Sequence, residues 1–104
     1  MATNLLARPA FLPGDVALTR TVGPFDAASL PPGLLREHRL REGSWGLLRL
    51  HEGRLHFVWD DEEGGRFCLE APAEVIVPPC APHHLELDGP ILVDISFYRV
   101  AAQD

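Results

Sequence analysis

The sequence lacks the features that usually mark membrane, exported and nucleic-acid-binding proteins. No apolar run is long enough to span a bilayer, and the first nine residues show no basic start followed by an apolar stretch. There is no basic cluster, and the formal net charge is −6. Acidic proteins repel phosphate backbones and anionic lipid. We therefore expect a cytoplasmic protein with no nucleic-acid or membrane partner.

Several catalytic signatures are also absent. The sequence contains no Gly-rich phosphate loop, no Gly-x-Ser-x-Gly and no His-Glu-x-x-His. It therefore gives no support for nucleotide use, serine hydrolysis or zinc-protease chemistry. Only two cysteines occur, Cys68 and Cys80. Since no export signal is seen, we expect both to be reduced thiols.

The composition that remains favours an all-β domain. A chain of 104 residues corresponds to one domain, and 9 Gly and 10 Pro leave little room for long helices. Turn signals recur about every ten residues, which is typical of short strands joined by turns. We predict an N-terminal arm over residues 1–13 and one β domain over residues 14–104.

Alternation of apolar and polar residues predicts the strands. Residues 45–51 and 54–59 each alternate, and Glu52-Gly53 between them is typical of a hairpin turn. Residues 66–70 can pair back across the acidic turn at 60–65. Further strands are expected over residues 15–21, 34–38, 74–77, 83–87 and 91–100, and a helix only over residues 25–30.

His83 is the most informative single residue. It alternates with Leu85 and Leu87 and should point inward, whereas His84 alternates with Glu86 and should face solvent. A buried imidazole needs a hydrogen-bond partner or a metal. Both interpretations of His83, structural core residue and metal ligand, are open at this point.

Several motifs in register resemble one small cupin family. They are Leu30 to His38 (LPPGLLREH), Gly43 to Gly46 (GSWG), Glu52-Gly53, Pro78 to His83 (PPCAPH) and Ile95 to Tyr98 (ISFY). In this order and spacing, over residues 12–99, the chain resembles the TehB/YeaR-like cupin family. The stretch from Val75 to His83 is also similar to the second conserved cupin motif, in which a strand, a Pro/Gly turn and a His follow one another.

The resemblance implies a small single-domain cupin-like β-barrel of the double-stranded β-helix or jelly-roll type. It implies a His-lined, zinc-binding pocket with no settled reaction, and a homodimer. That family includes the N-terminal domain of tellurite-resistance protein B, where it precedes a methyltransferase. The resemblance therefore also implies a link to tellurite or to nitrosative and oxidative stress.

The same match proposes a set of metal ligands. His83 stands where cupins place a ligand, and His38 fits one end of the first cupin motif. Cys80 stands where cupins usually carry Gly; it is either a zinc ligand in a Cys-x-x-His spacing or a small buried residue. The family tends to carry an acidic residue at the position of Ser96, and Asp94 is the candidate substitute. The predicted ligands are therefore His38, His83, Asp94 and Cys80.

Two further histidines are weaker candidates. His51 and His56 flank the Glu52-Gly53 turn and share a polar face with Arg49 and Arg54. We expect them to be solvated or paired across strands, and to join the site only if that face lines the barrel interior.

Three functions are compatible with these observations. The first is a module that binds a divalent metal, zinc in preference to iron, together with a small molecule or an oxyanion. The second is a small cupin enzyme, an iron dioxygenase or an isomerase; the missing carboxylates of the first cupin motif argue against it. The third is a metal-free sensing or interaction domain.

Overall fold

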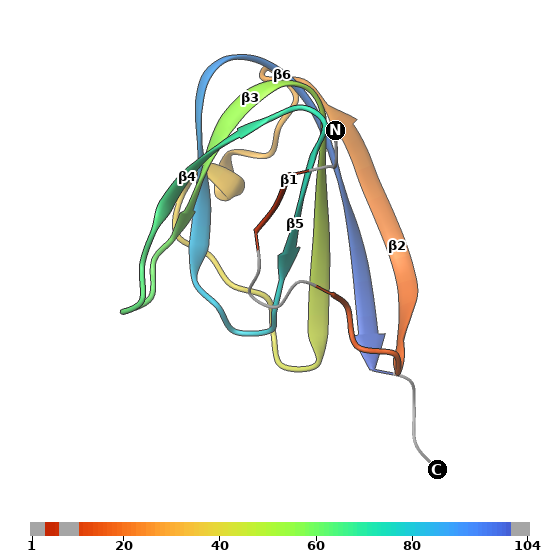
Figure 1. The fold of residues 1–104 in the computed structure, drawn as a ribbon. Helices are drawn as coiled ribbons and strands as arrows, with labels where there is room; N and C mark the ends of the chain where they lie inside the picture. Colours follow the sequence, from red (N-terminus) through yellow and green to blue (C-terminus); the bar gives the residue numbers. More distant parts are fainter. Residues whose placement is uncertain (1–3, 7–10, 101–104) are drawn as a thin grey trace.

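The computed structural model describes residues 4–6 and 11–100, and almost all of its regular structure is strand (Figure 1). The elements are β1 (Asn4–Leu6), β2 (Val16–Phe25), the 3-10 helix η1 (Pro32–Leu35), β3 (Ser44–Trp59), β4 (Arg66–Glu70), β5 (Ala73–Val77) and β6 (His83–Val100). They form one sheet in the order β1-β5-β3-β6-β2, and β4 pairs with β3. The predicted all-β, cupin-like fold is confirmed. Among the described residues, the sheet does not close into a barrel.

The two longest strands, β3 and β6, organise this sheet. They pair antiparallel from Ser44 opposite Arg99 to Trp59 opposite His83. The register shifts where Gly53 faces Ile91, and both strands arch over together at the top of Figure 1. Gly53 has a φ of 81°, and a Cβ there would overlap the carbonyl oxygen of Pro90. Only glycine allows this close backbone approach at the bend.

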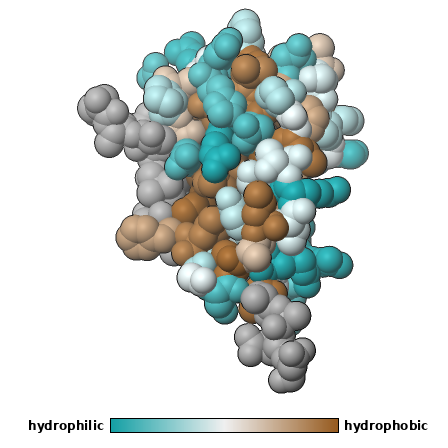
Figure 2. Space-filling view, turned by 90° about the vertical axis from the view of Figure 1, so that its right-hand side faces the viewer, coloured by the Kyte–Doolittle hydropathy of each residue, from teal (hydrophilic) through white to brown (hydrophobic). Residues whose placement is uncertain are grey.

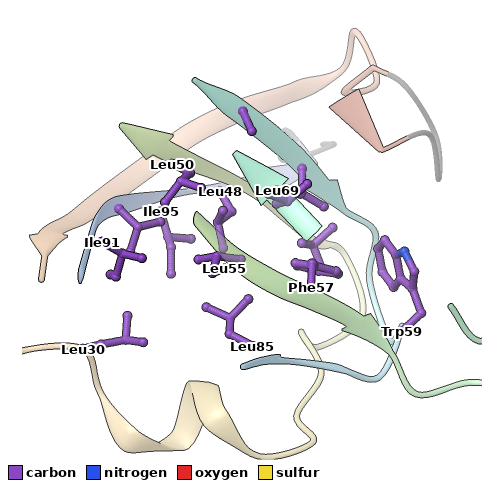
Figure 3. Packing of buried hydrophobic residues seen from close by; sticks show 14 residues of the cluster. Leu30, Leu48, Leu50, Leu55, Phe57, Trp59, Leu69, Leu85, Ile91 and Ile95 are labelled. Carbon is purple, nitrogen blue, oxygen red and sulfur yellow. The ribbon is translucent and has the colours of Figure 1, made fainter. Parts of the chain in front are cut away.

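The bend makes one face of the sheet concave, and the core lies on that face (Figure 3). Alternation along the strands supplies most of it, although Leu47 and Ile76 on the opposite face are also buried. Leu55, Phe57, Val75 and Val93 are fully buried. The remaining buried members of the cluster are Leu30, Leu48, Leu50, Trp59, Leu69, Ala73, Val77, Leu85, Ile91 and Ile95.

Three predicted strands or pairings are confirmed. Residues 54–58 of β3 pair antiparallel with residues 66–70 of β4 across the acidic turn. Residues 74–77 lie in β5, and the first long strand begins at Val16, although it continues to Phe25. Of the predicted arm, residues 4–6 pair in parallel with β5, and residues 1–3 and 7–10 lie outside the described residues.

The hairpin predicted at Glu52-Gly53 is wrong. Residues 44–59 form one continuous strand, because β6 pairs with it on both sides of Gly53 and turns the local irregularity into a bulge. The break predicted at Asp88-Gly89-Pro90 is wrong for the same reason, since residues 83–100 form one strand.

The segments before β3 also differ from the prediction. Residues 32–35 form η1 rather than a strand, with proline in the first turn. The helix predicted over residues 25–30 does not form. Instead, the Asp26 carboxylate accepts hydrogen bonds from the backbone N–H groups of Ala28 and Ser29, which stabilises an isolated turn. No helix in the described part of the chain is long and apolar enough to cross a membrane.

Replacing Gly53 with alanine should destabilise the fold by about 2 kcal/mol or more. The new Cβ would meet backbone of β6, which cannot move without opening the β3–β6 pairing. Urea unfolding followed by circular dichroism measures the change. Gly89→Ala is the matched control, because nothing lies within 4 Å of a Cβ at Gly89, on the opposite strand of the same bend. Equal effects of the two substitutions would contradict the proposed role of Gly53.

Candidate functional site

Two histidines that are 45 positions apart in the sequence meet at one end of the core. His38 lies in the loop before β3, and His83 is the first residue of β6. Their backbones form an antiparallel bridge, in which each N–H donates to the carbonyl of the other at 2.9 Å. Their ring centroids lie 4.1 Å apart. The structure therefore brings together the two histidines that the sequence resemblance selected.

In both rings the hydrogen bond uses Nδ1 and leaves Nε2 free. Nδ1 of His38 donates to the carbonyl of Arg36 at 2.9 Å, and Nδ1 of His83 donates to the carbonyl of Ala81 at 2.8 Å. A carbonyl oxygen only accepts, so Nδ1 carries the proton in each ring. Nε2 of each neutral ring then has an unshared electron pair, and none of the described residues is hydrogen-bonded to it.

A small apolar pocket lies in front of this pair. Its volume is about 120 Å³, room for a few atoms. Its walls come from the loop before β3 and from the inner faces of β3, β5 and β6, in agreement with the concave side seen in Figure 3. The lining residues are Leu34, His38, Leu40, Gly46, Leu48, Phe57, Val77, His83, Leu85, Ile95 and Phe97.

Aromatic contacts fix the ring of His83. The Phe57 ring stacks on it with a centroid distance of 5.3 Å and an interplanar angle of 7°. Trp59 approaches it edge-on at 6.1 Å. With 5% of its surface exposed, His83 faces inward, as its alternation with Leu85 predicts.

Burial also sets the protonation state of His83. Loss of hydration lowers its pKa to about 4; the hydrogen bond to Ala81 opposes this shift, and the nearby His38 adds to it. His83 is therefore neutral at pH 7, which is the form that binds metal ions.

The other predicted ligands lie elsewhere. Asp94 is on the opposite face of β6 from Val93 and Ile95, and its Oδ2 lies 2.7 Å from Nε2 of His51. Cys80 is exposed in the turn before β6, with a φ of 66°, and does not line the pocket. Within residues 4–6 and 11–100, no group of three or more His, Cys, Asp or Glu side chains could hold a metal.

The remaining histidines lie on the convex side of the sheet. His51 pairs with Asp94, and His56 is on the face of β3 opposite Phe57. His84 lies between Asp60 and Glu86, at 2.7 Å and 2.9 Å. The predicted outward orientation of His84 is confirmed. Its hydrogen bond to Asp60, and secondly that to Glu86, raise its pKa.

Sequence reasoning did not identify the pocket walls from the loop. Leu34 and Leu40 flank His38 at distances of four and two residues and close the pocket over it. The sequence feature that could have identified Leu40 is its place between Arg39 and Arg41. On an extended segment, an apolar residue between two charged ones is expected to point inward.

Between pH 6.5 and about 4, the free energy of unfolding should fall by up to about 3 kcal/mol on account of His83. The unfolded chain takes up a proton on this residue in that window and the folded chain does not. His84 acts above this window and in the opposite direction, because its pKa is raised and the folded chain takes up that proton first as the pH falls toward 6.5. Imidazole NMR titration separates the two. A midpoint for His83 at or above 6.5 would contradict the prediction.

Comparison with known structures supports the fold. TehB from Haemophilus influenzae superposes with a TM-score of 0.73 at 22% identity, over 84% of this chain and 32% of that one. A protein from E. coli strain K12 superposes with a TM-score of 0.75 at 20% identity, over 88% and 98%. The chain thus spans about a third of the H. influenzae protein. FeII HppE is more distant, with a TM-score of 0.54 at 20% identity, over 69% and 38%.

Sequence comparison identifies the family. No curated protein matches the chain. The family model described as the TehB-like domain, however, matches residues 20–97. This match covers well over half of the chain, including β3 to β5 and both pocket histidines, and it agrees with the structural likeness to TehB. The chain belongs to the TehB-like domain family.

Proposed function

We propose that His38 and His83 bind a divalent metal through their Nε2 atoms and that the adjoining pocket takes a small ligand. One observation carries the proposal: two imidazoles, each with Nδ1 hydrogen-bonded to a backbone carbonyl, face one apolar pocket. Histidines that bind metals usually donate their other nitrogen in this way, which fixes the tautomer and the ring orientation.

The donor set fits zinc better than iron. Imidazole nitrogen suits both ions, but non-haem iron sites typically add a carboxylate to two histidines. Among the described residues, no carboxylate forms a group with His38 and His83 that could hold a metal ion. We therefore favour zinc, with iron as the alternative. A bound zinc would supply a Lewis acid; the chain orients the two rings and keeps the ligand in apolar surroundings.

The cellular role that we propose follows from the family. Membership in the TehB-like family and the likeness to TehB support a protein of tellurite resistance, or of the response to nitrosative or oxidative stress, in the cytoplasm. Because the chain spans only about a third of that TehB, the activity of the longer protein is not assumed for this one.

A second candidate is a metal-free binding domain. The observation that favours it is the pocket lining, in which every residue except the two histidines is apolar or glycine. Such a pocket suits a small apolar group, with His38 and His83 as hydrogen-bond acceptors. In this case both histidines serve ligand recognition and packing alone.

Purified wild-type protein should contain close to one equivalent of zinc by elemental mass spectrometry, and His38→Ala and His83→Ala should lose it. Zinc added at about 100 times its Kd should stabilise the metal-free wild type by about 2.7 kcal/mol. His56→Ala is the control histidine, because it lies on the opposite face of β3. Cys80→Ser and Asp94→Asn test whether either residue is a further ligand.

Circular dichroism would show whether each variant folds. His38 is partly exposed, so its substitution keeps the test interpretable if His83→Ala unfolds. A wild type without metal, and without stabilisation by zinc or iron(II), would refute the metal site and leave the metal-free domain.

We further propose that the protein forms a homodimer through β2. This strand lies at one end of the sheet, and its outer edge pairs with no other strand in the described part of the chain. Free edges tend to pair with another chain unless they are protected. Leu18, which is 57% exposed, and Val100, which is 43% exposed, lie at this end of the molecule. Figure 2, which views the molecule from the β2 side, shows hydrophobic surface among polar side chains there.

Light scattering coupled to size-exclusion chromatography should give a dimer for the wild type and a monomer for Leu18→Glu. The new charge would be buried at the interface without a partner. Leu35→Glu, in η1 and 42% exposed, is the control and should stay dimeric. A monomeric wild type would refute the proposal.

A further inference from the structure

A second cavity, next to the histidine pocket, gathers arginines. It is a groove of about 440 Å³, large enough for a small anion with its bound water. Its lining comes from β2, from the loop before β3, from the first residue of β3 and from the C-terminal end of β6. The lining residues are Thr19, Arg20, Arg39, Leu40, Arg41, Ser44, Phe97 and Arg99.

Most of the positive charge in this groove has no carboxylate partner among the described residues. Three other arginines lie within ion-pair distance of carboxylates, namely Arg49, Arg54 and Arg66. Of the four in the groove, only Arg39 lies close to an acidic side chain within the described ranges, at 3.5 Å from Glu37. The chain has 15 acidic residues and only nine basic ones, yet no acidic residue of the described part lines the groove.

Two contacts position two of these arginines. Arg99 donates to the Ser44 hydroxyl at 2.6 Å, and the Arg20 guanidinium lies 5.2 Å from the centre of the Phe97 ring. Both contacts are made without a carboxylate, so the positive charges are positioned but remain available. Holding like charges together is unfavourable unless an anion binds between them.

We propose that this groove binds a small tetrahedral oxyanion of the phosphate type. The planar guanidinium offers paired N–H donors that match two oxygens of such an anion. The Ser44 hydroxyl accepts from Arg99 and keeps its own proton to donate to an anion, whereas the Thr19 hydroxyl already donates to the carbonyl of Phe97 at 3.1 Å. The site needs no metal, so it is independent of the function proposed for the histidines.

The groove and the histidine pocket are neighbours. Leu40 and Phe97 line both cavities, so an anion bound by the arginines would lie beside the wall of the pocket. The two cavities are chemically distinct, because one is lined by apolar residues and two histidines and the other carries four guanidinium groups.

Isothermal titration with inorganic phosphate, at an ionic strength held constant with sodium chloride, tests the proposal. We expect saturable binding to the wild type. Arg41→Gln should bind about tenfold more weakly, since one charge-assisted interaction is lost. Arg20→Gln should behave similarly. Both side chains are exposed and neither forms an ion pair in the described part of the chain, so both variants should fold.

Arg54→Gln is the control, because Arg54 is exposed and lies near Asp88 at the bend, away from the groove. It should bind phosphate as the wild type does. Phosphate binding no stronger than that of chloride, or an equal loss in all three variants, would overturn the proposal. Preferential binding of a short single-stranded DNA would also overturn it, in favour of a nucleic-acid surface. The titration is repeated with His38→Ala, which lacks one of the proposed metal ligands. Unchanged phosphate binding by this variant would show that the anion site does not depend on the metal site.

Discussion

The antiparallel pairing of β3 with β6, and its bend at Gly53, is the interaction on which the rest of the structure depends. The two strands run from Ser44 and Arg99 at one end to Trp59 and His83 at the other. Because they bend together, the inner face curves around the core instead of lying flat. The bend places the first residues of β6 and the middle of β3 on the same side of the cavity. His83 pairs with Trp59 and is the diagonal neighbour of Phe57 on the same face, so the Phe57 ring stacks on it.

The histidine pair adds one local constraint to this frame. The backbone of the loop before β3 is attached to the start of β6 through the reciprocal hydrogen bonds between His38 and His83. A further bond, from the N–H of Cys80 to the carbonyl of Leu40 at 2.8 Å, continues this attachment. The loop is thus held almost as a strand would be, although it has no regular sheet partner. The two imidazoles are brought together by these backbone hydrogen bonds rather than by the contact between the two imidazole rings.

Alternation along a single strand predicts only which face of the sheet each residue occupies. It placed His83 inward and His84 outward. The same rule argues against Asp94 as a ligand, because Val93 and Ile95 on either side of it are core residues. The family resemblance selected Asp94 by its distance from Ser96 in the sequence, and two positions along a strand preserve the outward face.

Other features depend on partners that a local pattern does not contain. Glu52-Gly53 is compatible with a tight turn or with a bulge, and the choice is made by β6, whose pairing partner at Gly53 is almost forty residues further along the chain. The meeting of His38 with His83 is likewise a long-range pairing. Only the family resemblance, which carries information on the whole fold, selected those two together. The groove of arginines has no sequence signature, because its members come from three separate segments.

One extended segment supplies both cavities, and its register explains how they stay distinct. His38 and Leu40 line the apolar pocket, while Arg39 and Arg41 line the groove. Successive side chains of an extended segment point to opposite sides. A slip by one residue would move the guanidinium groups into the apolar pocket, where unpaired charge is costly, and would move the imidazole of His38 away from His83. The backbone bonds at His38 and Leu40 fix the register at these two residues. The same few hydrogen bonds therefore keep the histidine pocket apolar and the arginine groove charged.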